Sequence, residues 1–267
     1  MDRRDVLMGG ASMLAATAAG CAQVPAGARD KPPFVLVHGA FHGGWCWARV
    51  AERLRAAGHR VYTPTLTGMG ERSHLIGPDV NLETHIQDVV NVIEYEELER
   101  VVLVCHSYAG IVGHGVADRA NPKLGGLVFF DAVLPDYGKS WSDYNTPQVV
   151  AQRRAEVDAR GKGYIWKPEQ SAAGYGIFEP ADVALFNRRV SAYPFGAYLQ
   201  KLEQKGPGLG TLPLAYIDCI KPALAPINQF RMKARTNPRF KVVPLEAGHD
   251  GMLTHPAEVA SILLSLA

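Results

Sequence analysis

The chain has 267 residues, a formal net charge of +2 and a hydrophobic content of 47%. This length suits one large α/β domain with a substantial core. The small net charge and the scattered Lys and Arg residues argue against a nucleic-acid-binding surface. After the first few turns of sequence, no apolar stretch reaches the roughly 20 residues that a membrane-spanning helix needs. We therefore expect one domain, at residues 29–267, without a membrane span.

Residues 1–28 have the features of an export signal. Two arginines precede an apolar run that is too short to span a bilayer stably, and residues 3–7 resemble a twin-arginine signal. Two processing sites compete: residues 18–21 resemble a lipobox ending in Cys21, and residues 26–28 have the small-x-small form of a signal-peptidase site. The alternative is a frayed N-terminal helix of a cytosolic enzyme. The leader predicts a bacterial protein that is exported, either periplasmic or lipid-anchored at Cys21.

Three further cysteines follow the leader, at positions 46, 105 and 219. Their number is odd, and their spacing is neither metal-like nor of the CxxC type. No disulfide framework is therefore expected.

Residues 101–110 organise the rest of the chain. An apolar β-branched run, typical of a buried parallel strand, ends in Ser107 and passes at once into small residues. This is the pattern of a nucleophile elbow, which presents the serine Oγ at the carboxyl edge of a sheet. Cys105 and Ala109 replace the two usual glycines but are themselves small. The alternative is that Ser107 serves only as a helix N-cap.

A second apolar strand at residues 34–39 leads into a glycine-rich turn at residues 40–47 and a helix near residues 45–57. Such a turn presents a backbone N–H to a developing oxyanion, unless its glycines serve only a tight turn. The other expected strands span residues 60–67, 124–130, 212–220 and 240–245, and the other expected helices span residues 84–97, 110–120 and 256–266. Their alternation predicts a mostly parallel sheet flanked by helices, with right-handed crossovers.

Residues 134–211 interrupt this alternation with Pro, Gly and aromatic residues around helical patches at residues 148–160 and 181–191. An insertion of this size predicts a cap over the carboxyl edge of the sheet, where ligands bind in open α/β sheets. Its aromatic residues are candidates either for the lining of a pocket or for the core of the cap: Trp141, Tyr164, Trp166, Tyr175, Phe178, Phe186, Tyr193, Phe195 and Tyr198.

His249 follows the last expected strand, at the sheet edge that also carries Ser107. In the chain order nucleophile, acid, histidine, it stands where the general base belongs. A single histidine on a loop is usually only solvated. Here a His-Gly loop, a serine elbow and a Gly-His loop follow three strands in the right order, with a cap-sized insertion between them, which favours a catalytic site.

Four stretches, residues 38–45, 66–75, 105–110 and 248–253, together resemble a bacterial esterase branch of the α/β-hydrolase superfamily. This branch is similar to plant salicylate methylesterase and hydroxynitrile lyase, and some bacterial members hydrolyse pyrethroid-like esters. The resemblance implies an α/β-hydrolase fold with a helical cap inserted after the sixth strand of the family. It also implies Ser107 as nucleophile, His249 as base and the backbone N–H groups of Ala40 and Tyr108 as oxyanion hole.

The implied activity is that of a carboxylesterase-type hydrolase, which cleaves a small apolar or aryl ester through an acyl-enzyme. No metal or organic cofactor is required, and the expected partner is the small-molecule ester. The sequence leaves open whether this is a methyl, aryl or pyrethroid ester, a carbamate or a lactone, and it leaves the oligomeric state open.

Two other functions remain as alternatives. A hydroxynitrile-lyase-like C–C lyase is disfavoured because that family places a lysine soon after the catalytic histidine and a threonine in the first oxyanion loop. The chain has Asp250-Gly251-Met252 and Gly39-Ala40-Phe41 at these places. A non-catalytic ligand-binding member of the fold would have lost a triad residue, whereas Ser107 and His249 are both retained.

The position that carries the catalytic acid in the family holds a different kind of residue in this chain. The resemblance places an aspartate in the loop after the seventh strand of the family, and alignment of residues 216–226 puts Pro222 at that position. Proline cannot orient an imidazole. Another carboxylate must therefore serve as the acid, or the acid is missing.

Three aspartates are candidates for this role. Asp218 lies within a strand, where its side chain should point toward a helix layer, and Asp250 adjoins the base and would need a strained backbone to turn back on it. Asp131 ends the strand beside the one that carries Asp218, and it keeps the order Ser, Asp, His. We predict Asp131 as the acid and Asp218 as the alternative; Asp131 would otherwise only cap the entry into the cap.

Overall fold

The computed structural model describes residues 31–267. The predicted leader at residues 1–28, including Cys21, lies outside the described residues. Among the residues that are described, no helix is both long and apolar enough to cross a membrane. Cys46, Cys105 and Cys219 are buried free thiols.

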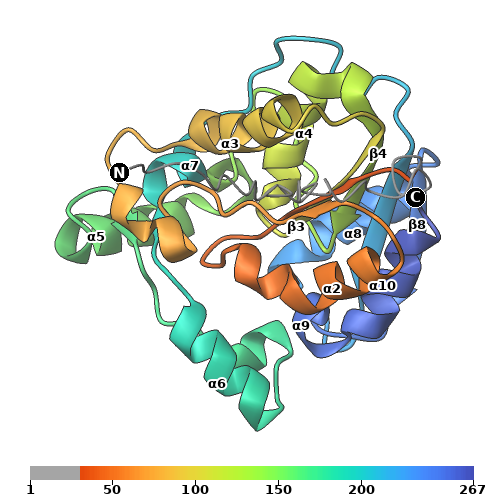
Figure 1. The fold of residues 1–267 in the computed structure, drawn as a ribbon. Helices are drawn as coiled ribbons and strands as arrows, with labels where there is room; N and C mark the ends of the chain where they lie inside the picture. Colours follow the sequence, from red (N-terminus) through yellow and green to blue (C-terminus); the bar gives the residue numbers. More distant parts are fainter. Residues whose placement is uncertain (1–30) are drawn as a thin grey trace, which may run out of the picture.

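The centre of the molecule is a six-stranded sheet in which every neighbouring pair of strands is parallel (Figure 1). The strand order is β2-β1-β3-β4-β7-β8. The strands are β1 (Phe34–Val37), β2 (Val61–Tyr62), β3 (Val101–His106), β4 (Leu124–Phe130), β7 (Leu214–Cys219) and β8 (Phe240–Leu245). The expected parallel sheet is therefore present, with β3 and β4 in the middle, where long apolar runs belong.

One strand is much shorter than expected. The sequence predicts a strand over residues 60–67, but only Val61 and Tyr62 pair with β1. β2 lies at the edge of the sheet, and Pro64 follows it closely. Proline has no N–H to donate to a strand neighbour, so the ladder ends early.

Helices cover both faces of the sheet (Figure 1). The α-helices are α2 (Ala48–Ala56), α3 (Leu82–Tyr95), α4 (Ala109–Ala120), α5 (Pro147–Arg160), α6 (Pro180–Arg189), α7 (Phe195–Leu199), α8 (Asn228–Thr236), α9 (Gly251–Thr254) and α10 (Pro256–Leu264). Short 3₁₀ helices are η1 (Gly44–Trp47), η2 (Gly70–Leu75), η3 (Asn121–Lys123), η4 (Ser142–Tyr144), η5 (Ala172–Tyr175) and η6 (Ala225–Ile227).

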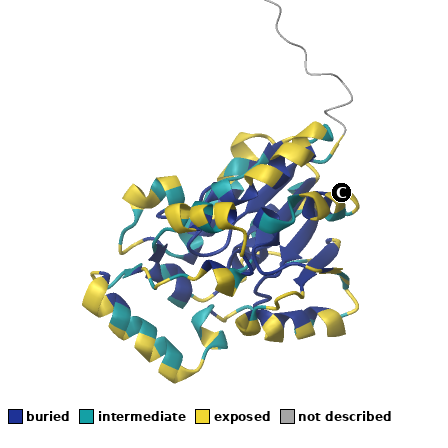
Figure 2. Ribbon diagram, turned by 90° about the horizontal axis from the view of Figure 1, so that it is seen from below, coloured by how far each residue is buried: buried dark blue, intermediate teal, exposed yellow. Residues whose placement is uncertain are grey.

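Alternate residues of a strand pack into two separate cores, one on each face of the sheet. Along β3, Leu103 and Cys105 pack on the side of α3, α4 and α8, whereas Val102 and Val104 pack on the side of α2 and α10. This alternation follows from the two-residue period of a strand. Figure 2 shows the strands buried on both faces and the outer faces of the helices exposed.

The connection from β4 to β7, called here the cap segment, contains α5, α6, α7 and a two-stranded antiparallel sheet of β5 (Ile165–Trp166) and β6 (Tyr193–Pro194). Its buried aromatic residues join the two cores of the sheet: Tyr193, Phe195 and Tyr198 pack into the core on the side of α3 and α4, and Phe186 into the core on the side of α2 and α10. Phe178, in contrast, is 64% exposed. The buried aromatic residues of this segment therefore attach it to the rest of the domain.

The cap segment touches the loop of His249 backbone to backbone. The Asp250 N–H donates to the Tyr175 carbonyl at 3.1 Å. A Cβ atom placed on Gly176 would lie 2.6 Å from the Cα of Gly248, and the reverse also holds. No side chain fits between the two segments at this point, so both positions require glycine.

Candidate active site

Ser107 occupies a sharp turn between β3 and α4. Its φ of 53° lies in the left-handed region that favours glycine, and a non-glycine residue there is strained. The turn is crowded, because a Cβ on Gly39 would lie 2.8 Å from Ser107 Cβ and one on Gly110 would lie 2.0 Å from the Val133 carbonyl oxygen. Strand, turn and helix thus have the geometry of a nucleophile elbow.

Cys105 stands where the elbow usually has its first glycine. Its side chain points at Gly113 of α4, where an added Cβ would lie 2.6 Å from the Cys105 Sγ. The close approach of strand and helix still depends on a glycine, but here that glycine belongs to the helix. This exchange explains how the fold tolerates the departure from the usual motif.

His249 lies on the loop between β8 and α9 and is buried. Its Nδ1 is 2.6 Å from Oδ2 of Asp131, which directly follows β4. The Asp131 N–H donates to the Ile217 carbonyl of β7 at 2.8 Å. Pairing of β4 with β7 therefore brings Asp131 to the sheet edge below the histidine.

Arg231 of α8 binds the same carboxylate. Its Nε donates to Oδ1 and its Nη2 to Oδ2 of Asp131, both at 2.8 Å. Burial alone would lower the pKa of Arg231, but its bonds with Asp131 raise it, so the guanidinium is charged. The carboxylate oxygens of Asp131 only accept hydrogen bonds, so His249 must donate to Oδ2 from Nδ1. This leaves His249 Nε2 as the proton acceptor.

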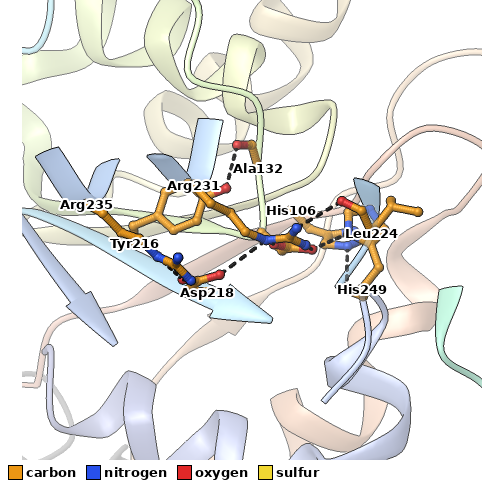
Figure 3. A network of polar contacts seen from close by, with 9 residues as sticks. His106, Ala132, Tyr216, Asp218, Leu224, Arg231, Arg235 and His249 are labelled. Atoms are coloured by element: carbon orange, nitrogen blue, oxygen red, sulfur yellow. Dashed lines mark hydrogen bonds and ion pairs between the residues drawn. The ribbon is translucent and has the colours of Figure 1, made fainter. Parts of the chain in front are cut away.

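The alternative acid, Asp218, faces away from His249. Its carboxylate accepts from Arg235 Nε at 2.8 Å and lies 3.2 Å from Arg231 Nε, on the side of the sheet that α8 covers (Figure 3). Asp250 contacts His42 instead, with 2.8 Å between His42 Nε2 and Asp250 Oδ2. Among the three aspartates considered from the sequence, Asp131 is the one in hydrogen-bond contact with His249.

The loop after β1 is held by a histidine to which sequence reasoning gave no role. His38 Nδ1 donates to the Gly39 carbonyl at 2.8 Å, while its Nε2 accepts from the Leu66 N–H at 3.0 Å. Burial lowers the pKa of His38 to about 3, so the ring is neutral. The Gly39 carbonyl and the Ala40 N–H belong to one planar peptide and point in opposite directions. His38 therefore fixes the direction of the Ala40 N–H.

Tyr108, the second predicted oxyanion donor, is the N-cap residue of α4. Backbone N–H groups at this end of a helix have no acceptor within the helix, so they are free to bind an anion. The side chain takes no part in this, because the Tyr108 hydroxyl lies 2.9 Å from His85 Nδ1 in the core. Tyr108 would therefore bind the oxyanion through its backbone N–H and not through its side chain.

A cavity of about 590 Å³ joins these residues. Ser107, His249 and Ala40 lie on its wall together with His42 and His106. Its aromatic lining consists of Phe41, Trp141, Tyr144, Trp166, Tyr175 and Phe230, and its charged lining of Arg153, Glu156 and Glu169. A mostly apolar cavity with a few polar groups is typical of a small-molecule site.

The cavity lining differs in part from the expected one. Of the nine aromatic candidates in the cap segment, Trp141, Trp166 and Tyr175 line the cavity. Tyr144 and Phe230, which sequence reasoning did not identify, lie edge to face against each other with their ring centroids 5.0 Å apart. Phe230 belongs to α8, whose closeness to the cap segment depends on the tertiary fold.

One histidine cluster resembles a metal site in composition. The ligating atoms of His106, His249 and Asp250 lie within 4.8 Å of one another. His106 Nε2, however, lies 3.0 Å from the His249 carbonyl oxygen and must carry a proton to donate to it. Burial holds the pKa of His106 well below its usual value, so its ring is neutral. The cluster is therefore better described as a hydrogen-bond network that fixes the loop of His249.

The comparison with protein families agrees with this fold. The model of an alpha/beta hydrolase family matches residues 34–262. The chain belongs to the α/β-hydrolase family. The resemblance and the fold expected from the sequence are thereby confirmed.

Curated relatives of this α/β-hydrolase are esterases. It is 40% identical over 243 residues to a carbendazim-hydrolysing esterase of Nocardioides sp. (strain SG-4G), a match that covers 87% of this chain and 98% of the relative. It is 36% identical to methylesterase 9 of Arabidopsis thaliana, with 88% and 97% covered. The protein is accordingly a carboxylesterase-type hydrolase.

Solved structures share its fold. An extracellular alpha/beta-hydrolase from a Paenibacillus species has a TM-score of 0.76 at 23% identity and covers 88% of this chain and 98% of its own. A pyrethroid hydrolase from Sphingobium faniae has a TM-score of 0.65 at 18% identity, with 88% and 96% covered. At these identities the likeness concerns the fold alone.

Proposed function

We propose that this hydrolase cleaves the carboxylic ester of a small apolar or aryl substrate through an acyl-enzyme, with Ser107 as nucleophile, His249 as general base and Asp131 as acid. One observation carries the proposal. His249 Nδ1 lies 2.6 Å from Asp131 Oδ2, on the wall of a cavity that also contains the strained Ser107. Nucleophile, base and orienting acid are the three parts of a hydrolytic triad.

The reaction would begin when Ser107 Oγ attacks the ester carbonyl and His249 Nε2 takes the hydroxyl proton. The carbonyl oxygen becomes an oxyanion, which accepts hydrogen bonds from the N–H groups of Ala40 and Tyr108. When the C–O bond breaks, His249 returns the proton to the leaving alcohol. Water then attacks the acyl-enzyme with the same histidine as base, and the acid and free Ser107 are released. Apart from the attacking water, these steps use groups of the protein.

Two features support an aryl or apolar ester. Trp141 and Trp166 lie on the cavity wall, and a volume of about 590 Å³ suits a small aromatic molecule. The names of the relatives point to two classes for the first assays, methyl esters and the carbamate-type compound carbendazim. We propose methyl or carbamate esters of aromatic groups as the substrates to test before others.

The test is a hydrolysis panel run with wild type and Ser107→Ala. The panel contains p-nitrophenyl acetate, methyl benzoate, carbendazim, a pyrethroid and a lactone. We expect wild type to hydrolyse at least one of them and to be labelled by a fluorophosphonate, and Ser107→Ala to do neither while remaining folded. Equal labelling of both proteins would refute the serine mechanism, and cleavage of a cyanohydrin without ester hydrolysis would support the lyase instead.

We also propose that the domain is exported and that residues 134–211 form the cap over the active site. The export proposal rests on the twin arginines and the short apolar run at residues 1–28. Lipidation of Cys21 would anchor the enzyme to a membrane, and the mass of the mature N-terminus distinguishes a lipidated Cys21 from cleavage after residue 28.

A further inference from the structure

His42 lies beside the predicted triad, and both of its ring nitrogens face oxygen acceptors. Nδ1 is 2.7 Å from the Ala40 carbonyl oxygen, and Nε2 is 2.8 Å from Oδ2 of Asp250. A carbonyl oxygen only accepts hydrogen bonds, and a carboxylate does the same. Each nitrogen must therefore carry a proton if both bonds are made, which is the case only in the imidazolium.

We propose that His42 and Asp250 form a buried imidazolium–carboxylate pair that positions the loop of Ala40 against the loop of His249 during ester hydrolysis. The proposal rests on the proposed function for the roles of Ala40 and His249. His42 is a positioning residue in this scheme, since it exchanges no proton with the substrate. Its charge is what allows it to bind both loops at once.

The surroundings of His42 suit a cation. The Trp45 ring is stacked on the imidazole, with the centroids 5.5 Å apart and an interplanar angle of 16°. The rings of Tyr175 and Phe186 lie 5.8 Å away. The faces of aromatic rings attract cations, so this arrangement favours the charged form of the ring.

The charge balance at this place is consistent with a single ion pair. Burial alone would lower the pKa of His42, but the charge and hydrogen bond of Asp250 outweigh burial and raise it. Asp250 Oδ1 lies 3.7 Å from Nε2 of His106, which is neutral. The other ionisable groups around the pair are His38, Cys46, Glu71, Tyr175, Cys219 and His249.

The pair is needed because the loop is strained. Phe41 has a φ of 67°, a conformation that non-glycine residues rarely adopt. It is held by the bond from His42 to the Ala40 carbonyl and by the N–H and hydroxyl of Ser191, which donate to the Phe41 carbonyl at 2.8 Å and 3.4 Å. When His42 loses its proton, one of its two bonds must break, which frees either the Ala40 carbonyl or the Asp250 carboxylate.

The first test needs no substrate. In protein labelled with ¹⁵N-histidine, we expect the His42 ring to show two protonated nitrogens at pH 7, with the signal assigned by its loss in His42→Gln. Asp250→Asn keeps the shape of the partner but removes its charge, so the His42 signal should become that of a neutral ring. A neutral His42 in wild type at pH 7 would overturn the proposal.

The second test is kinetic. We expect Asp250→Asn to lower kcat about tenfold with little change in KM, and to abolish a decline of wild-type kcat at alkaline pH. Fluorophosphonate labelling of Ser107 in wild type reports separately on the proposed function, so the two ideas fail in distinguishable ways. His74→Gln, a change at an exposed histidine, is the matched control and should leave the profile as in wild type. An Asp250→Asn profile that retains the alkaline decline would contradict the positioning role.

Discussion

Arg231 and Asp131 meet through two parallel hydrogen bonds, both 2.8 Å long, in a part of the molecule from which solvent is excluded. This bidentate contact fixes the plane of the carboxylate, because the guanidinium and the carboxylate match in geometry as well as in charge. Oδ2 is thereby directed at His249. The acid of the proposed triad is thus held by a residue of α8, and several consequences can be measured.

Asp131→Asn should lower kcat by about one to four decades, the upper end being the loss seen when a triad aspartate is neutralised in serine proteases. The amide would no longer hold His249 with Nδ1 protonated. Asp218→Asn is the matched control and should change kcat little, because Asp218 contacts Arg231 and Arg235 and not the histidine. The reverse ranking of the two kcat values would make Asp218 the acid.

Arg231→Gln should lower both kcat and stability. The variant leaves the buried Asp131 carboxylate without its guanidinium partner, whereas Asp218 keeps Arg235. Breaking a buried ion pair typically costs about 3–5 kcal/mol of the free energy of unfolding. Arg235→Gln provides the comparison, because Arg235 contacts Asp218 alone and its side chain is 45% exposed. Urea unfolding and ester hydrolysis should separate the two variants. Equal losses in both would show that Arg231 has no special role toward Asp131.

Gly113→Ala should destabilise the domain by about 1–3 kcal/mol, because its methyl group would overlap the Cys105 sulfur. The double variant Cys105→Ala with Gly113→Ala should recover most of this loss, since the second change removes the sulfur. Thermal unfolding of the four proteins in this cycle measures the coupling between the two positions. Strictly additive losses would mean that strand and helix do not meet at this pair.

Stability should fall as pH is lowered from about 6.5 toward 4. Burial lowers the pKa of His38 to about 3 and those of His85 and His114 to about 4. As the pH falls, these histidines are therefore protonated in the unfolded chain before they are protonated in the folded protein. Each such group contributes up to about 1.4 kcal/mol of lost stability per pH unit in this window. The pKa of His42 is raised in the folded protein, so protonated His42 contributes to stability at low pH. This contribution is lost at higher pH, where His42 of the folded protein loses its proton.

Urea unfolding at a series of pH values checks this acid dependence. His114→Gln should reduce the dependence of the unfolding free energy on pH by the contribution of one proton. His114 bonds to the Gly110 carbonyl at 3.1 Å, packs against the rings of Phe129 and Tyr137, and lies outside the catalytic loops. A free energy of unfolding that stays constant between pH 6.5 and 4.5 would contradict the neutral state assigned to these histidines.

Replacement of Arg3 and Arg4 by lysine should keep the enzyme in the cytoplasm, if the leader follows the twin-arginine route. Fractionation of cells that produce either protein, followed by the esterase assay, measures the distribution. Arrival of the variant in the periplasm would show that the leader uses another route or none.

Much of the fold and part of the site could be predicted from local sequence. The strand periodicity placed Ser107 and His249 at one sheet edge, and adjacency of two strands singled out Asp131. Arg231 and the roles of His38 and His42 escaped prediction, because their contacts join residues that only the tertiary fold brings together. Arg231, for example, lies 100 positions from Asp131 along the chain. The early end of β2 could have been predicted from Pro64, because proline has no N–H to donate to a neighbouring strand.

The glycine contact between Gly176 and Gly248 also couples the cap segment to the loop of His249. Because the two backbones touch there, lifting the cap at this point would drag His249 away from Asp131. At this contact the cap segment therefore cannot move independently of the loop of His249. Gln152 of α5 and Gln229 of α8 line the cavity and are exposed, so the cavity reaches the surface beside these two helices.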